Sequence, residues 1–166
     1  DLDVPVVSAV RGPAAGIGCS LALAADFCIA AESAYFLQAF VNIGLVPDGG
    51  ASWLLPNLVG RARALELMLL GERLKSDKAL DWGLIYRLVP DDVLENEAWA
   101  FAERLAAGPT LALGMMRKGV TAALNQSFAE AMAREAHDQA IARNSADSIE
   151  GGKAFFEGRK PEFQGR

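Results

Sequence analysis

The stretch Val4–Ala31, VPVVSAVRGPAAGIGCSLALAADFCIAA, decides the fold. Its apolar, β-branched run over Val4–Val10 predicts a strand that is buried on both faces. A loop of small residues over Arg11–Gly18 follows, and then a helix over Cys19–Ala25 and a second strand over Phe27–Ala31. Strand, loop, helix and strand in this order are typical of a parallel α/β layer.

The rest of the chain predicts short elements around one loop and then helices to the end. After a third strand within Tyr35–Phe40 we expect a loop over Asn42–Ser52, a helix over Gly60–Leu70, a short helix up to Trp82 and a strand over Leu84–Val89. Helices are then expected over Leu94–Ala107, Pro109–Ala123, Ser127–Arg143 and Ile149–Gly158, with Ser127 and Glu130 as a capping box. The predicted class is α/β, with a core over residues 1–90 and a helical tail over 91–166.

The composition excludes several classes of function. The 166 residues are 52% hydrophobic and 22% charged, which predicts a globular protein, and the net charge of −5 argues against a nucleic-acid partner. The apolar stretches end well before the about 20 residues that span a bilayer, so we expect no membrane partner. Cys19 and Cys28 cannot form the paired motifs of a zinc site, so no metal is expected, and we interpret them as inert core thiols. His137, between Glu135 and Asp138, is interpreted as part of a solvated face.

The chain opens Asp1-Leu2-Asp3, without an initiator methionine or a signal-peptide pattern, and enters an apolar strand at once. We therefore expect a sequence joined partway through, in a cytoplasmic protein.

The first candidate site is the loop that contains Ala15, Gly16, Ile17 and Gly18. Free N–H groups at a helix start stabilise negative charge, and small residues let a ligand approach the backbone closely. The Lys and Ser/Thr of a phosphate-binding P-loop are absent, as is the third glycine of a dinucleotide-binding motif. A tight strand-to-helix turn and an oxyanion hole, with the Ile17 N–H facing an enolate, both stay open.

The second candidate site is Asp48, within VPDGGAS at residues 46–52. An Asp before two glycines and a helix is usually a cap or a turn residue. Its neighbours Ile43, Leu45 and Val46 are apolar, however, and an apolar pocket raises the pKa of a carboxyl group, which suits a general acid or base. Basic residues near the C-terminus, Lys153, Arg159, Lys160 and Arg166, form either a solvated end or an anchor for a nucleotide phosphate.

Several motifs, in the same order, resemble the enoyl-CoA hydratase/isomerase, or crotonase, superfamily. They are VVSAVRGPAAGIG at residues 6–18, Ala25-Asp26, residues 36–52, LVGRARA at 58–64, ALDWGL at 79–84 and FFEGRKPEFQG at 155–165. The resemblance implies a crotonase-like (ClpP/crotonase) fold of ββα units, of which this chain is the C-terminal part. A preceding segment then supplies the rest of the sheet, one oxyanion donor and much of the coenzyme A pocket.

The resemblance also implies an acyl-CoA thioester as substrate, whose enolate is held by two backbone N–H groups, one of them that of Ile17. Ala15, Gly16, Gly18, Pro47 and Trp53 are then substrate-binding residues. The two glutamates of hydratases fall on Ser20 and Phe40, which we also place at the substrate; neither side chain activates water. The loop at Asp48 is similar to that of the ring-1,2-epoxyphenylacetyl-CoA isomerase branch, in which a single Asp is the acid/base group.

We therefore expect a double-bond isomerase of fatty or aromatic acid catabolism, with Asp48 moving the proton and Phe40 sealing a dry pocket. The alternatives are a hydratase (a lyase) with an altered water site, a CoA-dependent dehalogenase, and a non-catalytic acyl-CoA-binding subunit in which Asp48 is only a cap. Coenzyme A enters as part of the substrate, so no separate cofactor is expected. The family's basic coenzyme A contact falls on Gly158, which leaves Lys153 or Lys160 for the phosphates. A homotrimer or a dimer of trimers, assembled through the tail, is implied.

Overall fold

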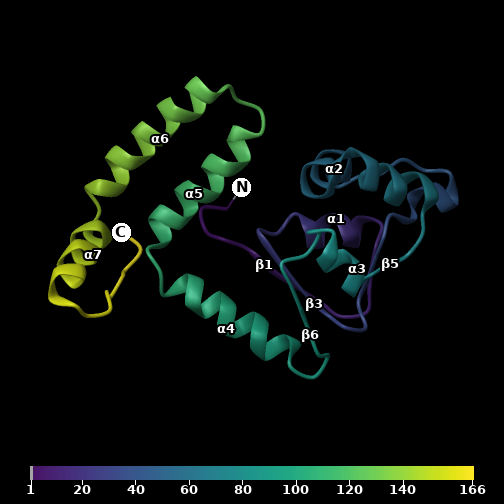
Figure 1. Ribbon diagram of the computed structural model, residues 1–166, viewed down its shortest axis with the longest axis horizontal. Helices are drawn as coiled ribbons and strands as arrows, with labels where there is room; N and C mark the ends of the chain where they lie inside the picture. The colour runs from purple at the N-terminus through teal and green to yellow at the C-terminus, as the bar shows by residue number, and fades with distance from the viewer. Residues whose placement is uncertain (1) are drawn as a thin grey trace. The chain divides into compact units, whose positions relative to one another are not determined.

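The structure is a computed structural model that describes residues 2–166. Two compact units are present, one formed by Val6–Ala100 and the other by residues 2–5 together with 101–166. Figure 1 shows the helices and strands of both units. Between residues 2 and 166 no helix is both long enough and apolar enough to cross a membrane.

Two three-stranded sheets organise the unit Val6–Ala100 (Figure 1). The first is wholly parallel, in the order β1 (Val7–Val10), β3 (Phe27–Ala31) and β6 (Arg87–Val89). In the second, β2 (Pro13–Ala15) pairs in parallel with β4 (Tyr35–Leu37), which pairs antiparallel with β5 (Leu74–Lys75). Ile29, Ala30 and Ala31 of the central strand β3 are fully buried. The expected α/β layer is therefore present, and β3 is its strand covered on both faces. The prediction of a strand buried on both faces over Val4–Val10 is wrong: this strand begins at Val7, and only Val10 of it is buried.

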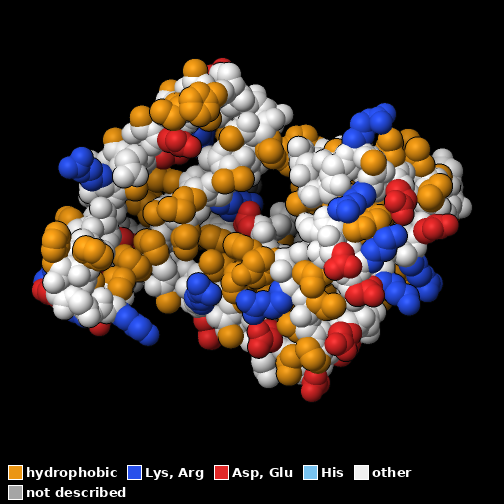
Figure 2. Space-filling model, in the orientation of Figure 1, with side chains coloured by type: hydrophobic (Ala, Val, Ile, Leu, Met, Phe, Trp, Pro, Cys, Tyr) orange, Lys and Arg blue, Asp and Glu red, His pale blue; other side chains and the backbone are white. Residues whose placement is uncertain are grey.

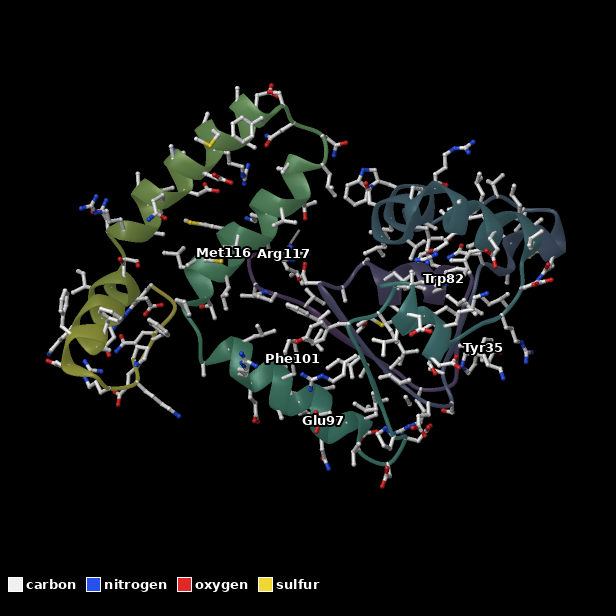
Figure 3. All side chains as sticks on the ribbon, in the orientation of Figure 1. Tyr35, Trp82, Glu97, Phe101, Met116 and Arg117 are labelled. Carbon is white, nitrogen blue, oxygen red and sulfur yellow. The ribbon has the colours of Figure 1, made fainter. Side chains whose placement is uncertain are left out.

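Three helices and a 3-10 helix complete this unit. They are α1 (Ile17–Leu23), the 3-10 helix η1 (Ala39–Ile43), α2 (Ala51–Leu70) and α3 (Ser76–Asp81). The first half of α2 buries Ala51, Leu55 and Val59, which recur every four residues and so share one face. The helix is interrupted at Gly60, whose φ of 77° and ψ of 162° are not helical. The ring of Trp82, labelled in Figure 3, contacts two cations: Arg63 of α2 at 5.1 Å and Lys78 of α3 at 4.6 Å from its centroid.

The helical unit contains α5 (Thr110–Ala123), α6 (Phe128–Arg143) and α7 (Ala146–Glu157), while α4 (Leu94–Ala106) runs across the boundary between the units. The predicted capping box starts α6: the Glu130 N–H donates to Ser127 Oγ, and the Ser127 N–H donates to Glu130 Oε2 at 2.8 Å. Figure 2 shows apolar side chains gathered over these helices. Phe128 and Met132 of α6 are both exposed. The chain end folds back onto α7, where the buried Asp147 carboxylate accepts the backbone N–H groups of Gln164 and Gly165.

Several predicted boundaries differ from the structure. The segment predicted as a loop at residues 11–18 contains β2, because residues 13–15 pair with the distant β4. Of the third predicted strand only Tyr35–Leu37 is extended, and Phe40 lies in η1. Helix α2 begins at Ala51, nine residues before the predicted start at Gly60.

Candidate active site

The turn before α1 leaves backbone N–H groups without partners. Gly16 has a φ of 54°, a conformation that favours glycine, and its N–H donates to the Leu37 carbonyl at 2.8 Å. The Gly16 carbonyl accepts the N–H groups of Cys19 and Ser20 at 3.0 and 3.2 Å. The N–H groups of Ile17 and Gly18, in the first turn of α1, have no acceptor among residues 2–166. They are the orphan donors of a helix start and can stabilise a developing oxyanion.

Asp48 lies in the loop between η1 and α2. Gly49 and Gly50, with φ values of 61° and 84°, turn the chain into α2, and the Asp48 carbonyl accepts the Ala51 N–H at 3.2 Å. The N-cap of α2 is Gly50, and no side chain caps this helix. The Asp48 carboxylate is exposed and has no hydrogen-bond partner within the described part of the chain. The structure therefore does not use Asp48 as the helix cap that its position had suggested.

The apolar pocket that the sequence predicts around Asp48 is not formed by residues 2–166. Ile43, Leu45 and Val46 are 73%, 59% and 81% exposed, because η1 ends at Gly44 and the loop then runs along the surface. The carboxylate is therefore open to solvent in the described chain.

A direct contact joins the Asp48 loop to α1. The Ser20 hydroxyl donates to the Asp48 carbonyl at 2.9 Å, and the Ser20 side chain is fully buried. The neighbouring Gly49 is so close to α1 that a Cβ atom on it would lie 2.5 Å from Ile17 Cδ1 and 2.8 Å from Ser20 Cβ. Asp48 is thus held beside the turn that carries the free Ile17 N–H. The Asp-Gly-Gly pattern indicated only a turn at Gly49, and the close contact of this residue with α1 is seen only in the structure.

Phe40 lies close to Gly16 of the turn. Its ring is buried, at 8% exposure, and a Cβ atom on Gly16 would lie 3.7 Å from Phe40 Cζ. The Phe40 carbonyl accepts the N–H groups of Gly44 and Leu45, which closes η1. Position 20 therefore carries a hydroxyl that is hydrogen-bonded to the Asp48 carbonyl, and position 40 carries an apolar ring. Neither position supplies a second carboxylate.

The remaining predicted substrate residues are distributed around the same turn and loop. Ala15 and Gly18 are exposed, Pro47 is half-buried, and Trp53 in the first turn of α2 is 39% exposed. Gln38, which precedes η1, was not among the predicted site residues, because glutamine in a short loop is ordinarily solvated. It is buried at 1% exposure, and its side chain interacts with the buried Cys19 thiol of α1.

The two cysteines have the character expected of core thiols. Cys19 and Cys28 are buried, and burial raises the pKa of the Cys19 thiol to about 11 and that of Cys28 above its usual range. A raised pKa removes the thiolate at neutral pH, so neither is activated as a nucleophile. Within residues 2–166 no cluster of three or more His, Cys, Asp or Glu side chains could hold a metal ion.

Lys153 and Lys160 both lie in the helical unit. Lys153 on α7 is 3.9 Å from Glu157, and Lys160 is exposed beyond the end of this helix. The adjacent Arg159 bonds Glu150 and Glu157 at 2.6 Å each, and these carboxylates raise its pKa. Its guanidinium is occupied, whereas Lys153, Lys160 and the exposed Arg166, which donates to the Gln164 side chain, remain as cations to consider for a phosphate.

Comparison with known proteins gives matches along the whole chain. Residues 1–166 match the family described as Enoyl-CoA hydratase/isomerase. The chain is 43% identical to the 1,2-epoxyphenylacetyl-CoA isomerase of Escherichia coli and 46% identical to a protein of Rhodobacter capsulatus named "Probable enoyl-CoA hydratase", over 99% and 98% of its length. It covers 63% of each of these relatives. The crystal structure of an enoyl-CoA hydratase from Bacillus anthracis, 32% identical, superposes over 100% of this chain and 64% of its own with a TM-score of 0.95.

Proposed function

Because this chain belongs to the enoyl-CoA hydratase/isomerase (crotonase) family, we propose that the protein containing it moves the double bond of an acyl-CoA thioester, with Asp48 carrying the proton. The family resemblance and the crotonase-like fold expected from the sequence are both confirmed by the whole-chain match and by the solved structures. The chain spans less than two thirds of the curated relatives that it matches.

One observation supports the proposal: the backbone of Asp48, whose carboxylate has no hydrogen-bond partner among residues 2–166, lies beside a turn with free backbone N–H groups. The Ser20–Asp48 hydrogen bond and the close approach of Gly49 to Ile17 bring the loop and the turn together. At the two positions where hydratases of this family are expected to have glutamates, the chain has Ser20 and Phe40. One carboxylate suffices for an isomerase, because the group that removes a proton from one carbon can return it to another.

In the proposed reaction, the Asp48 carboxylate removes a proton from C2 of a 3-enoyl thioester. The electrons move into the thioester carbonyl, and the Ile17 N–H donates to the resulting dienolate oxygen. Asp48, now a carboxylic acid, returns the proton at C4, so that a 2-enoyl thioester forms and the carboxylate is restored. Phe40 keeps the space beside Gly16 apolar, which strengthens the hydrogen bond to the oxyanion. Neither water nor a separate cofactor takes part.

The test is Asp48→Asn in the whole protein that contains these residues. Asparagine has nearly the same shape but accepts no proton, so we expect conversion of a 3-enoyl-CoA to the 2-enoyl-CoA to fall by about 100-fold or more. The binding constant of a saturated acyl-CoA should stay unchanged, since the thioester still meets the same backbone donors. Isomerisation by Asp48→Asn at the wild-type rate would rule out Asp48 as the proton carrier.

Hydration is the second candidate, and the name of the Rhodobacter capsulatus relative favours it. Water must then be held by groups other than side chains at positions 20 and 40. The two functions separate in one experiment: a hydratase converts a 2-enoyl-CoA to a 3-hydroxyacyl-CoA, whereas the proposed isomerase only shifts the double bond. A covalent adduct on Asp48 after incubation with a haloaryl-CoA indicates the dehalogenase alternative. Binding without any turnover indicates a non-catalytic subunit.

Lys153 and Lys160 remain our proposed contacts to the coenzyme A phosphates, and a trimer or a dimer of trimers our proposed assembly. Exposed apolar side chains on the helical unit support the second proposal, since Phe128, Phe155 and Phe156 are each more than 80% exposed.

A further inference from the structure

The Ser20 hydroxyl makes its better hydrogen bond outside its own helix. A serine within a helix commonly donates to the carbonyl four residues earlier, which is that of Gly16. Here Ser20 Oγ is 3.5 Å from the Gly16 oxygen but 2.9 Å from the Asp48 oxygen, and only the shorter distance is typical of a hydroxyl donor. The hydroxyl therefore serves mainly to join α1 to the Asp48 loop.

The bond holds a backbone atom of Asp48 and leaves the carboxylate without a partner. Because the Asp48 carbonyl also accepts the Ala51 N–H, it is fixed from two sides, by α1 and by the first turn of α2. Gly49 packs against Ile17 and Ser20 with no room for a side chain, so the loop has little freedom to slide along α1. The side chain can rotate about a fixed backbone.

We propose that Ser20 is a positioning residue, whose hydroxyl sets the place of the Asp48 carboxylate relative to the Ile17 N–H. The inference rests on the proposed function, because it concerns the proton transfer by Asp48. Without the hydroxyl, the loop keeps its bond to Ala51 but is held against α1 by packing alone, and the carboxylate samples positions from which it does not reach the substrate carbon. A misplacement of about 1 Å is enough to slow a reaction by about 100-fold.

The chain offers a matched control in Ser76. Its hydroxyl is also buried, at 3% exposure, and donates to a backbone carbonyl, that of Glu32, at 3.0 Å. Ser20→Ala and Ser76→Ala therefore remove the same kind of bond from the same kind of environment, and their effects on the urea unfolding midpoint should be similar. A merely structural role of Ser20 predicts similar kinetics for the two variants as well.

We expect kcat of Ser20→Ala to fall by about 10- to 100-fold, while the binding constant of a saturated acyl-CoA changes by less than about twofold. Ser76→Ala should keep both values. In the Asp48→Asn background, adding Ser20→Ala should lower the residual rate no further, since a positioning residue acts only through the group it positions. Ser20→Cys, which keeps a weak donor, should lie between Ser20→Ala and the wild type and provides a second variant if the alanine variant does not fold.

Three outcomes contradict the positioning role: wild-type kcat in Ser20→Ala, an equal loss in Ser76→Ala, or an additive loss in the double variant. Failure of the proposed function is a different result. If Asp48→Asn itself isomerises normally, Asp48 is not the proton carrier. If Asp48→Asn is inactive and Ser20→Ala is not impaired, the function stands and only the role of Ser20 is wrong.

Discussion

Substitution of Gly49 by Ala tests the close packing of the Asp48 loop on α1. The backbone φ of 61° costs a residue with a Cβ atom about 1–2 kcal/mol. The new methyl group would lie 2.5 Å from Ile17 Cδ1 and 2.8 Å from Ser20 Cβ, and overpacking of this kind costs about 1–3 kcal/mol. The lower entropy of the unfolded chain offsets about 0.4–1 kcal/mol. We expect Gly49→Ala to lower the free energy of unfolding by about 2–4 kcal/mol.

Gly50→Ala is the matched control for this measurement. Gly50 has a φ of 84°, but the nearest atom to its Cβ would be Leu54 Cδ1 at an ordinary 3.9 Å. This variant has the backbone strain without the clash, so it should lose only about 1 kcal/mol. Urea unfolding followed by circular dichroism gives both free energies, and the isomerase assay shows whether only Gly49→Ala also lowers kcat. Equal unfolding free energies for the two variants would refute the packing of Gly49 against α1.

Two further predictions follow from the perturbed pKa values. Burial raises the pKa of Cys19 to about 11 and also raises that of Cys28. Neither thiol of the folded protein should therefore react with a disulfide reagent at pH 8, whereas both should react once guanidinium unfolds the chain. Rapid reaction of the folded protein would contradict the burial. Hydrogen bonds from the Arg159 guanidinium and, to a smaller extent, from the Glu162 N–H lower the pKa of Glu150 from 4.5 to about 2. These bonds therefore stabilise the folded protein fully above pH 4.5, and this stabilisation is lost as the pH falls toward 2. Glu150→Gln should therefore lower the thermal unfolding midpoint at pH 7, and the difference in midpoint from wild type should shrink between pH 4.5 and pH 2. A difference in midpoint that does not depend on pH would show that the ion pair does not contribute.

The elements predicted well from the sequence are those whose causes are local. Helix α6 runs over Phe128–Arg143, as its capping box indicates, and α5 ends at Ala123 as predicted. Strand β2 was missed because its three small residues form a strand only through pairing with β4. The start of α2 was missed because Gly49, Gly50 and Pro56 all favour a loop, whereas the buried stripe of Ala51, Leu55 and Val59 favours the helix and prevails.

In the candidate site, too, features with local causes are visible in the sequence, and features that depend on distant contacts are not. Local motifs make Asp48 and Ile17 candidates, but the same motifs fit a helix cap and a tight turn, and the roles proposed for the two residues come from the family resemblance. The surroundings of Asp48 are not visible in the sequence, because the apolar residues beside it in sequence turn out to face solvent. The bond from Ser20 to Asp48 joins residues 28 positions apart, which no local pattern encodes.

The contacts around the site hold the turn and the Asp48 loop through backbone atoms. The turn is tied to β4 by the Gly16 N–H and the Leu37 carbonyl, and the loop is tied to α1 by Ser20 and the Asp48 carbonyl. Both ties end on backbone atoms. The carboxylate itself accepts no hydrogen bond from residues 2–166, so a ligand can contact it without displacing a bond that holds the loop.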